Sequence, residues 1–174
     1  MYNNINKHIF CDLILAPCNR FPEVLTRTAD SEPISVKVAD FDNSSMPDIA
    51  VANYGASNIG IFLNNGNGTF GDQVIYPTEG NPTDIAVADI NGDGNIDVIA
   101  TLGWNRVVVL LNNGTGVFKN LTYYPTSGWS YSLAVTDFNE DNKLDIVVVL
   151  PDLNATSVLR NSGTGTFPNE VVYK

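Results

Sequence analysis

Short runs of Val, Ile and Leu, about ten residues apart and bounded by clusters of Gly, Asn, Asp and Pro, are the dominant pattern along the chain. This pattern is typical of β-strands joined by turns. In the clearest stretch it predicts four strands: 84–88, 96–102, 106–112 and 118–124. No stretch of ten or more residues repeats its apolar positions at the 3.6-residue helical spacing, so we expect an all-β protein with almost no helix.

The second and third predicted strands of this stretch are nearly continuous apolar runs. A sheet with one face in water would alternate apolar and polar residues, so continuous runs indicate strands that are covered on both faces. Sheets stacked face to face around an axis would supply that cover.

The chain also repeats itself at an offset of 48 to 49 residues. Three markers recur in each unit: a Val-Ala-Asp or Val-Thr-Asp triplet, an Asp followed by Ile or Val eight residues later, and a Gly-x-Gly-x-Phe turn. They divide the chain into repeats at 36–82, 83–130 and 131–174, while 1–35 resembles the degenerate end of a preceding unit. Four strands per unit favour antiparallel β-propeller blades over the alternative, a seven-stranded sandwich.

Propellers usually close with about four to eight blades. Three units and a remnant therefore predict a partial propeller. The chain would be a fragment, an open arc, or a piece completed by self-association or by further blades of a longer chain.

The composition excludes some classes of binding partner. Nineteen acidic against nine basic residues give a net charge of −10, which would repel nucleic acid and anionic membranes. The apolar runs are far shorter than the roughly 20 residues that span a bilayer, so we expect no membrane span. Cys11 and Cys18 lack the spacing of a zinc or redox motif, and whether they form a disulfide stays open.

Each repeat carries a nine-residue acidic loop between its first two predicted strands, at 40–48, 89–97 and 137–145. Oxygen-bearing side chains occupy loop positions one, three, five and nine, and position seven would offer its backbone carbonyl. The candidate metal ligands are Asp40, Asp42, Ser44, Met46 and Asp48; Asp89, Asn91, Asp93, Asn95 and Asp97; and Asp137, Asn139, Asp141, Lys143 and Asp145.

Calcium is the ion that this donor set suits, because it takes about six to eight hard oxygen ligands in a flexible shell, whereas Mg²⁺ rarely uses a full protein cage. Two carboxylates about 4 Å apart repel by roughly 4 kcal/mol at an effective dielectric of 20. Each loop gathers three carboxylates, so a cation would relieve a substantial cost of folding. Position six needs a positive φ, which Gly94 and Asn142 tolerate better than Ser45. We therefore expect the second loop to be the best site, then the third, then the first.

Two other interpretations of the loops compete with a calcium site. Asp, Asn and Gly also form ordinary turns without any metal, although threefold recurrence at a fixed spacing argues against this. An EF-hand is excluded because strands flank the loops and because position twelve holds Val51, Ala100 and Val148 instead of Glu.

The segment Val87 to Val98, followed by Leu111 to Phe118, resembles the FG-GAP/VCBS repeat, the blade unit of integrin α-subunit propellers. The resemblance covers about residues 36–174. It implies a seven-bladed propeller when complete, calcium in the loop between strands one and two, and an extracellular or cell-surface role in adhesion or ligand binding. The chain departs from the pattern in its small number of blades and in Ser44, Ser45 and Pro47 of the first loop.

Catalysis has little support in the sequence. The only histidine, His8, lies outside the repeats, and no nucleophile elbow, phosphate loop or HExxH pair is present, so we expect no enzyme. The turns at the opposite ends of the blades carry aromatic residues that are candidates for contact with a protein or glycan ligand. These are Tyr54, Trp104, Trp129 and Tyr131.

The sequence thus predicts a calcium-stabilised, non-enzymatic module that binds a ligand outside the cell. Three alternatives remain: a carbohydrate-binding, lectin-like propeller; a propeller fragment that accompanies an enzyme domain; and the product of a non-functional gene fragment.

Overall fold

The computed structural model describes residues 32–174, which form three antiparallel sheets of four strands each. The first sheet contains β1 (Pro33–Ala39), β2 (Asp48–Asn53), β3 (Asn58–Phe62) and β4 (Val74–Pro77). The second contains β5 (Pro82–Ala88), β6 (Asp97–Leu102), β7 (Arg106–Asn112) and β8 (Phe118–Pro125). The third contains β9 (Ser132–Thr136), β10 (Asp145–Leu150), β11 (Ala155–Arg160) and β12 (Asn169–Tyr173).

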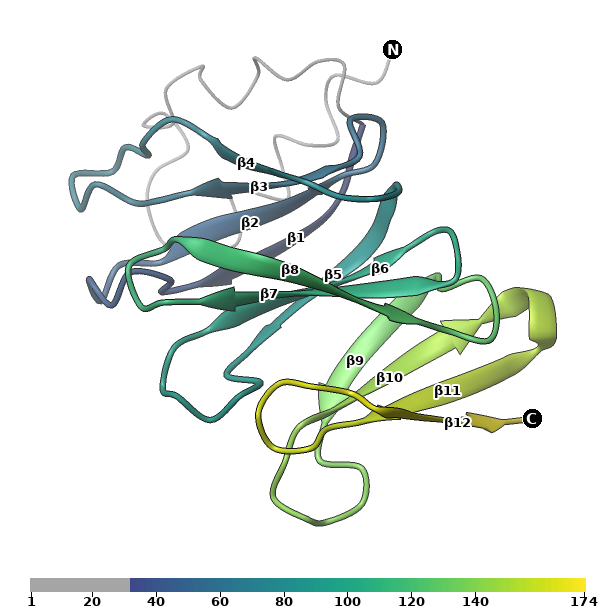
Figure 1. Ribbon diagram of the computed structural model, residues 1–174. Helices are drawn as coiled ribbons and strands as arrows, with labels where there is room; N and C mark the ends of the chain where they lie inside the picture. Colours follow the sequence, from purple (N-terminus) through teal and green to yellow (C-terminus); the bar gives the residue numbers. More distant parts are fainter. Residues whose placement is uncertain (1–31) are drawn as a thin grey trace.

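Within each sheet the strands pair in chain order, as successive hairpins. The first strands β1, β5 and β9 pack beside one another, and the sheets follow each other like the blades of a fan (Figure 1). This arrangement confirms the all-β partial propeller. The first predicted unit, 1–35, lies almost wholly outside the described residues, as do Cys11 and Cys18, and β1 already begins at Pro33.

All four strands predicted for the middle repeat are present, and their bounds differ from the prediction by at most two residues. Among the described residues there is no α-helix, only a short 3₁₀ turn, η3 (Pro151–Leu153), between β10 and β11. No helix in this part of the chain is long and apolar enough to cross a membrane.

The middle sheet is covered on both faces, as its continuous apolar strands predict. Alternate residues of β6 point in opposite directions: Val98, Ala100 and Leu102 pack toward the first sheet, and Ile99 packs toward the third. Two separate apolar clusters result, one in each gap between sheets. Burying apolar side chains stabilises a fold by roughly 25 cal/mol per Å², so these gaps hold the blades together.

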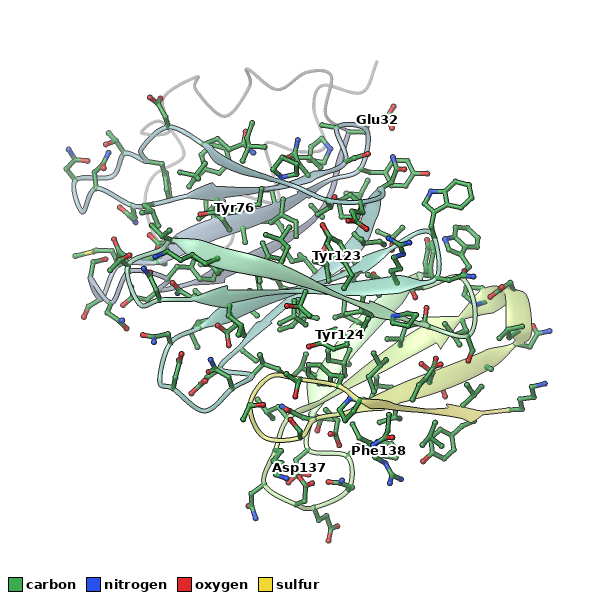
Figure 2. The ribbon with its side chains drawn as sticks, viewed as in Figure 1. Glu32, Tyr76, Tyr123, Tyr124, Asp137 and Phe138 are labelled. Carbon is green, nitrogen blue, oxygen red and sulfur yellow. The ribbon has the colours of Figure 1, made fainter. Side chains whose placement is uncertain are left out.

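The Phe of the second and third Gly-x-Gly-x-Phe turns lies at the junction of two blades. Phe118 meets the ring of Tyr76 edge-on, with ring centres 5.5 Å apart, and Phe167 meets Tyr124 in the same way at 5.1 Å. The Tyr124 hydroxyl also donates a hydrogen bond to the Gly165 carbonyl of the next blade, at 3.2 Å. Tyr76 and Tyr124 can be followed in Figure 2 on the outer strands of the first and second sheets. In the second and third blades the turn therefore packs the blade against its predecessor.

The third sheet differs, because its outer face is partly open. Val149 is 42% exposed, Tyr173 is 41% exposed, and the Phe138 ring lies 5.7 Å from that of Tyr173. The predicted cover on both faces concerns the middle sheet, which has a neighbouring sheet on each side. The outer face of the third sheet has no neighbouring sheet among residues 32–174.

Candidate metal-binding loops and an aromatic rim

The three acidic loops lie along one rim of the fan, where each first strand connects to its second (Figure 1). The turns from second to third strands lie along the opposite rim. Figure 2 labels Asp137 and Phe138 at the start of the loop between β9 and β10. The alternation of strand directions in a meander places equivalent loops of successive blades at the same end.

The first Asp of each loop organises the turn by accepting hydrogen bonds from the backbone N–H groups four and five residues later. All six distances lie between 2.7 and 3.1 Å. The accepting residues in the three loops are Asp40, Asp89 and Asp137.

The loops turn through two residues of positive φ each. At position six these are Ser45 (66°), Gly94 (86°) and Asn142 (62°), which confirms the expectation of a sharp turn there. Position four is also left-handed, in Asn43 and Gly92 and even in Glu140, and sequence reasoning did not anticipate it. A non-Gly residue with positive φ is uncommon, so all three loops are held in one conformation by their side-chain hydrogen bonds.

The last Asp of each loop is fully buried: Asp48, Asp97 and Asp145 are all 0% exposed. Burial raises the pKa of Asp97 to about 6, and the nearby charges of Asp93 and Asp89 add to the rise, while two backbone hydrogen bonds oppose it. Burial likewise raises the pKa of Asp48. The charged form of these carboxylates is thus costly in the bare protein, and a bound cation would offset that cost.

In the first loop the acidic groups converge. One carboxylate oxygen each from Asp40, Asp42 and Asp48 lie within 4.8 Å of one another, the only such group among residues 32–174. These are hard oxygen donors, and a carboxylate has about four lone-pair positions, so those that already accept N–H groups can still bind an ion. The donor set fits calcium. The expected order ranks this loop last, but its Asp42 supplies at position three the acid that the other two loops replace by Asn.

Positions three to seven differ more between loops. In the second and third loops the Asn at position three donates to the Asp at position five: Asn91 to Asp93 at 2.9 Å and Asn139 to Asp141 at 3.2 Å. Lys143 at position seven lies 3.8 Å from Asp141, in a partly exposed pair. Its ammonium group therefore balances part of the charge of the third loop.

Two further candidate ligands, Ser44 and Asn95, accept hydrogen bonds within or between the loops. The Ser44 hydroxyl accepts the Met46 N–H at 3.3 Å, and Asn95 accepts a hydrogen bond from Asn43 of the first loop at 3.1 Å. The side chain of Asn95 thus faces the neighbouring loop, which leaves its carbonyl as the donor that the sequence assigned to position seven.

Sequence reasoning missed an Asn that stands at the end of each third strand or within two residues after it: Asn64, Asn112 and Asn161. Its backbone N–H donates to the last Asp of the loop in the same blade, at 2.7 to 2.9 Å. The signal was available, since each Asn stands two residues before the first Gly of the Gly-x-Gly-x-Phe turn, but the repeat gives it no role until the loops are seen together.

On the opposite rim three of the four predicted aromatic residues gather. Trp129 and Tyr131 stack edge-on, with ring centres 5.9 Å apart. The indole nitrogen of Trp129 lies so close to Gly103 that a Cβ there would stand 3.1 Å from it, and Trp104 follows directly in the chain. Trp104 is 72% exposed and Tyr131 55%. Tyr54 makes no ring contact with these three.

Comparison with known proteins identifies the family to which the chain belongs. The family model of the FG-GAP-like repeat matches residues 40–100 and again 92–148. The fold and its repeated acidic loops define a β-propeller repeat protein. The chain belongs to the family of FG-GAP-like repeats.

No curated protein matches the sequence. Among solved structures, the chain is similar to a lectin of Agrocybe aegerita, described by its specific recognition of non-reducing terminal N-acetylglucosamine (26% identity, TM-score 0.55). It is also similar in fold to BBS1N in complex with ARL6DN (18% identity, TM-score 0.55). These matches cover 79% and 80% of this chain but only 37% and 43% of those proteins, so the chain spans less than half their length.

Proposed function

We propose that the chain is a calcium-stabilised propeller module without enzymatic activity, which binds a ligand outside the cell. The observation that carries the proposal is the recurrence of one loop geometry in three blades, in which the first Asp accepts N–H groups of the same tight turn, together with the convergence of three carboxylates in the first loop. Asp40, Asp42 and Asp48 would hold the ion in the first loop, with Ser44 and the Met46 carbonyl completing the oxygen set. Equivalent positions would do so in the other two loops.

In this proposal calcium supplies positive charge and ligand geometry, and its role is structural. The residues of the chain do the rest: the first Asp shapes the turn, and the buried last Asp ties the loop to its third strand. An ion that binds only the folded chain stabilises it by about 2.7 kcal/mol per site at 100 times its dissociation constant.

The experiment is thermal unfolding in calcium and in chelator. We expect a higher melting temperature in calcium, and a smaller calcium-dependent increase for Asp97→Ala and Asp145→Ala. Asp72→Ala serves as the control, because Asp72 is an exposed carboxylate outside the loops. Identical melting of the wild-type chain in both buffers would overturn the proposal.

The extracellular setting rests on the kind of calcium site. Extracellular modules bind calcium at about 0.1 to 1 mM, and several Asn-x-Ser/Thr triplets of the chain are potential glycan acceptors. Dissociation constants in this range would support the setting. Constants below about 1 µM, the range of cytosolic sensors and buffers, would argue against it.

The aromatic rim favours a second candidate function, recognition of a glycan. Exposed indole rings stack on the apolar faces of sugars, and the similar Agrocybe aegerita protein is a lectin. The test is a glycan array with Trp104→Ala and Trp129→Ala, and with Tyr54→Ala as the control from the same rim. Binding that only the two Trp variants lose would support the candidate, whereas an array without binding would exclude it for the sugars present.

A further inference from the structure

A continuous chain of hydrogen bonds links the three acidic loops across the blades. Within a blade, the last Asp of the loop accepts two backbone N–H groups, one on each carboxylate oxygen. In the second blade Asp97 accepts Ile90 at 3.0 Å and Asn112 at 2.7 Å. Asp48 and Asp145 accept the equivalent pairs in their blades, at 2.7 to 3.3 Å.

The links between blades come from the side chains of the third-strand Asn residues. Asn112 donates its Nδ2 to the Phe41 carbonyl in the first loop, and Asn161 donates to the Ile90 carbonyl in the second, both at 2.7 Å. Each pair is separated by 71 residues. The full path therefore runs through Asp145, Asn161, Ile90, Asp97, Asn112, Phe41 and Asp48.

The peptide groups on either side of Phe41 and Ile90 connect the hydrogen bonds within a blade to those between blades. The N–H of each of these residues donates to a candidate ligand of its own loop, and its carbonyl accepts a hydrogen bond from the Asn of the next blade. These peptide groups are shielded from solvent, because Phe41 is 0% exposed, Ile90 2% and Asn161 5%. Water cannot replace a lost partner there, so a shift of one loop must move its neighbour or leave a buried polar group unsatisfied.

We propose that Asn112 and Asn161 are positioning residues that couple neighbouring loops, so that the loops bind calcium cooperatively. The inference rests on the proposed calcium function and adds its regulation. An ion that fixes Asp145 in the third loop would also fix Asn161 and, through Ile90, the last Asp of the second loop. By linkage the effect is reciprocal, and we expect about a tenfold rise in the affinity of each loop when its neighbour is filled.

Asn64 provides a matched control. Its backbone N–H donates to Asp48, as the equivalent groups do in the other blades, and its Nδ2 donates to the carbonyl of Pro47 in its own loop. Asn112 and Asn161 make that same bond within their blades, to Ile96 and Leu144. Within residues 32–174 Asn64 makes no bond to a preceding loop, and in this it differs from both Asn112 and Asn161. Asn161 alone also accepts the Gly165 N–H, at 3.2 Å.

The experiment is a calcium titration of the full chain followed by backbone amide NMR signals, with Ser45, Gly94 and Asn142 reporting on the first, second and third loops. Because the coupling is reciprocal, Asn161→Ala should weaken binding by the second and the third loop about tenfold each, and should change the first loop less. Asn64→Ala should leave the second loop unchanged. A merely structural role would not move the affinity of one neighbouring loop selectively.

A second variant leaves the buried path intact in case Asn161→Ala does not fold. Asp137→Asn keeps one of the two oxygens that accept N–H groups of the loop, and weakens the third loop as a calcium site. It should weaken the second loop through Asn161, whereas unchanged second-loop affinity would overturn the coupling. Equal effects of Asn161→Ala and Asn64→Ala would overturn it as well. If no loop of the wild-type chain responds to calcium, the proposed function itself fails.

Discussion

At the scale of single residues, Asp84 joins all three blades. Its Oδ1 accepts hydrogen bonds from the Ser35 hydroxyl and the Ile85 N–H, both at 2.9 Å. Its Oδ2 accepts the Ser132 hydroxyl at 2.7 Å and the Leu133 N–H at 3.2 Å. These partners belong to β1, β5 and β9, so one carboxylate links the first strands of the three sheets.

This environment predicts a pH dependence. Burial raises the pKa of Asp84, but the hydrogen bonds from Ser132, Ser35 and two backbone N–H groups outweigh it, and the net pKa is lowered. A carboxyl whose pKa is lower in the folded state adds stability above its unfolded pKa of about 3.9, and this stability is lost as the pH falls through the folded pKa.

Asp84→Asn should therefore lower the free energy of unfolding at pH 7 by about 2 kcal/mol, and the gap from wild type should narrow at pH 3. Urea unfolding at both pH values in chelator measures this. Exposed Asp72→Asn is the control and should leave the free energy nearly unchanged. A gap for Asp84→Asn that is equal at the two pH values would contradict the assignment.

Ser157 of β11 is a single residue that opposes stability. Its hydroxyl is buried in the apolar gap between the second and third sheets and has no hydrogen-bond partner. At the equivalent position of the middle sheet stands Val108. Ser157→Ala should raise the free energy of unfolding by about 1 kcal/mol in chemical denaturation, because the desolvated hydroxyl is removed. The exposed neighbour Thr156→Ala should change it by less than about 0.5 kcal/mol. A loss of stability in Ser157→Ala would show that the hydroxyl has a favourable role.

At the scale of elements, the turns after the third strands lock one blade onto the previous one. Gly116 has a φ of +70°, its N–H donates to the Phe41 carbonyl at 2.8 Å, and a Cβ there would lie 2.7 Å from the Leu63 side chain. Gly68, in the equivalent turn of the first blade, has a φ of +82°, but a Cβ there would have no neighbour within 4 Å. The two glycines share a backbone conformation and differ only in their neighbours.

Gly68→Ala should cost about 1 to 2 kcal/mol, the penalty of an L-residue in the left-handed region. Gly116→Ala should cost about 1 kcal/mol more, because Leu63 must also move. Denaturant midpoints of both variants in the same buffer measure the difference. Equal losses would mean that the contact between the blades adds nothing.

The elements were predictable to different degrees. The strands of the middle repeat follow from apolar runs bounded by turn residues, and the loop positions follow from the spacing of Asp. The roles of Asn112 and Asn161 could not be derived, because each depends on a carbonyl 71 residues earlier in the chain. At the ligand positions, the three acids of the first loop stand at one, three and nine, and those of the other two loops at one, five and nine, a difference that the expected ranking did not weigh.

At the scale of the whole molecule, the outer face of the third sheet is equivalent to the face of the second sheet that the third one covers. Ile99, Val107 and Val109 of the second sheet lie in the shared apolar cluster. On the third sheet Val149 and Tyr173 remain exposed. We predict that a further blade of the same repeat would cover this face, and that its third-strand Asn would reach the Phe138 carbonyl.

A chain extended by a second copy of residues 126–174 tests this. The copied segment starts with the natural connection between the second and third sheets, and so keeps the repeat in register. We expect a higher melting temperature than that of the original chain, and slower hydrogen exchange in β10 and β11. Unchanged melting and exchange would show that the face does not accept a blade.

The most direct test of the central claim, that the loops bind calcium, is isothermal titration calorimetry of the folded chain. We expect saturable uptake of three calcium ions per chain, and of two when Asp89→Ala removes the first ligand of the second loop. A well-folded chain that takes up no calcium, or a variant that takes up as much as the wild type, would contradict the account.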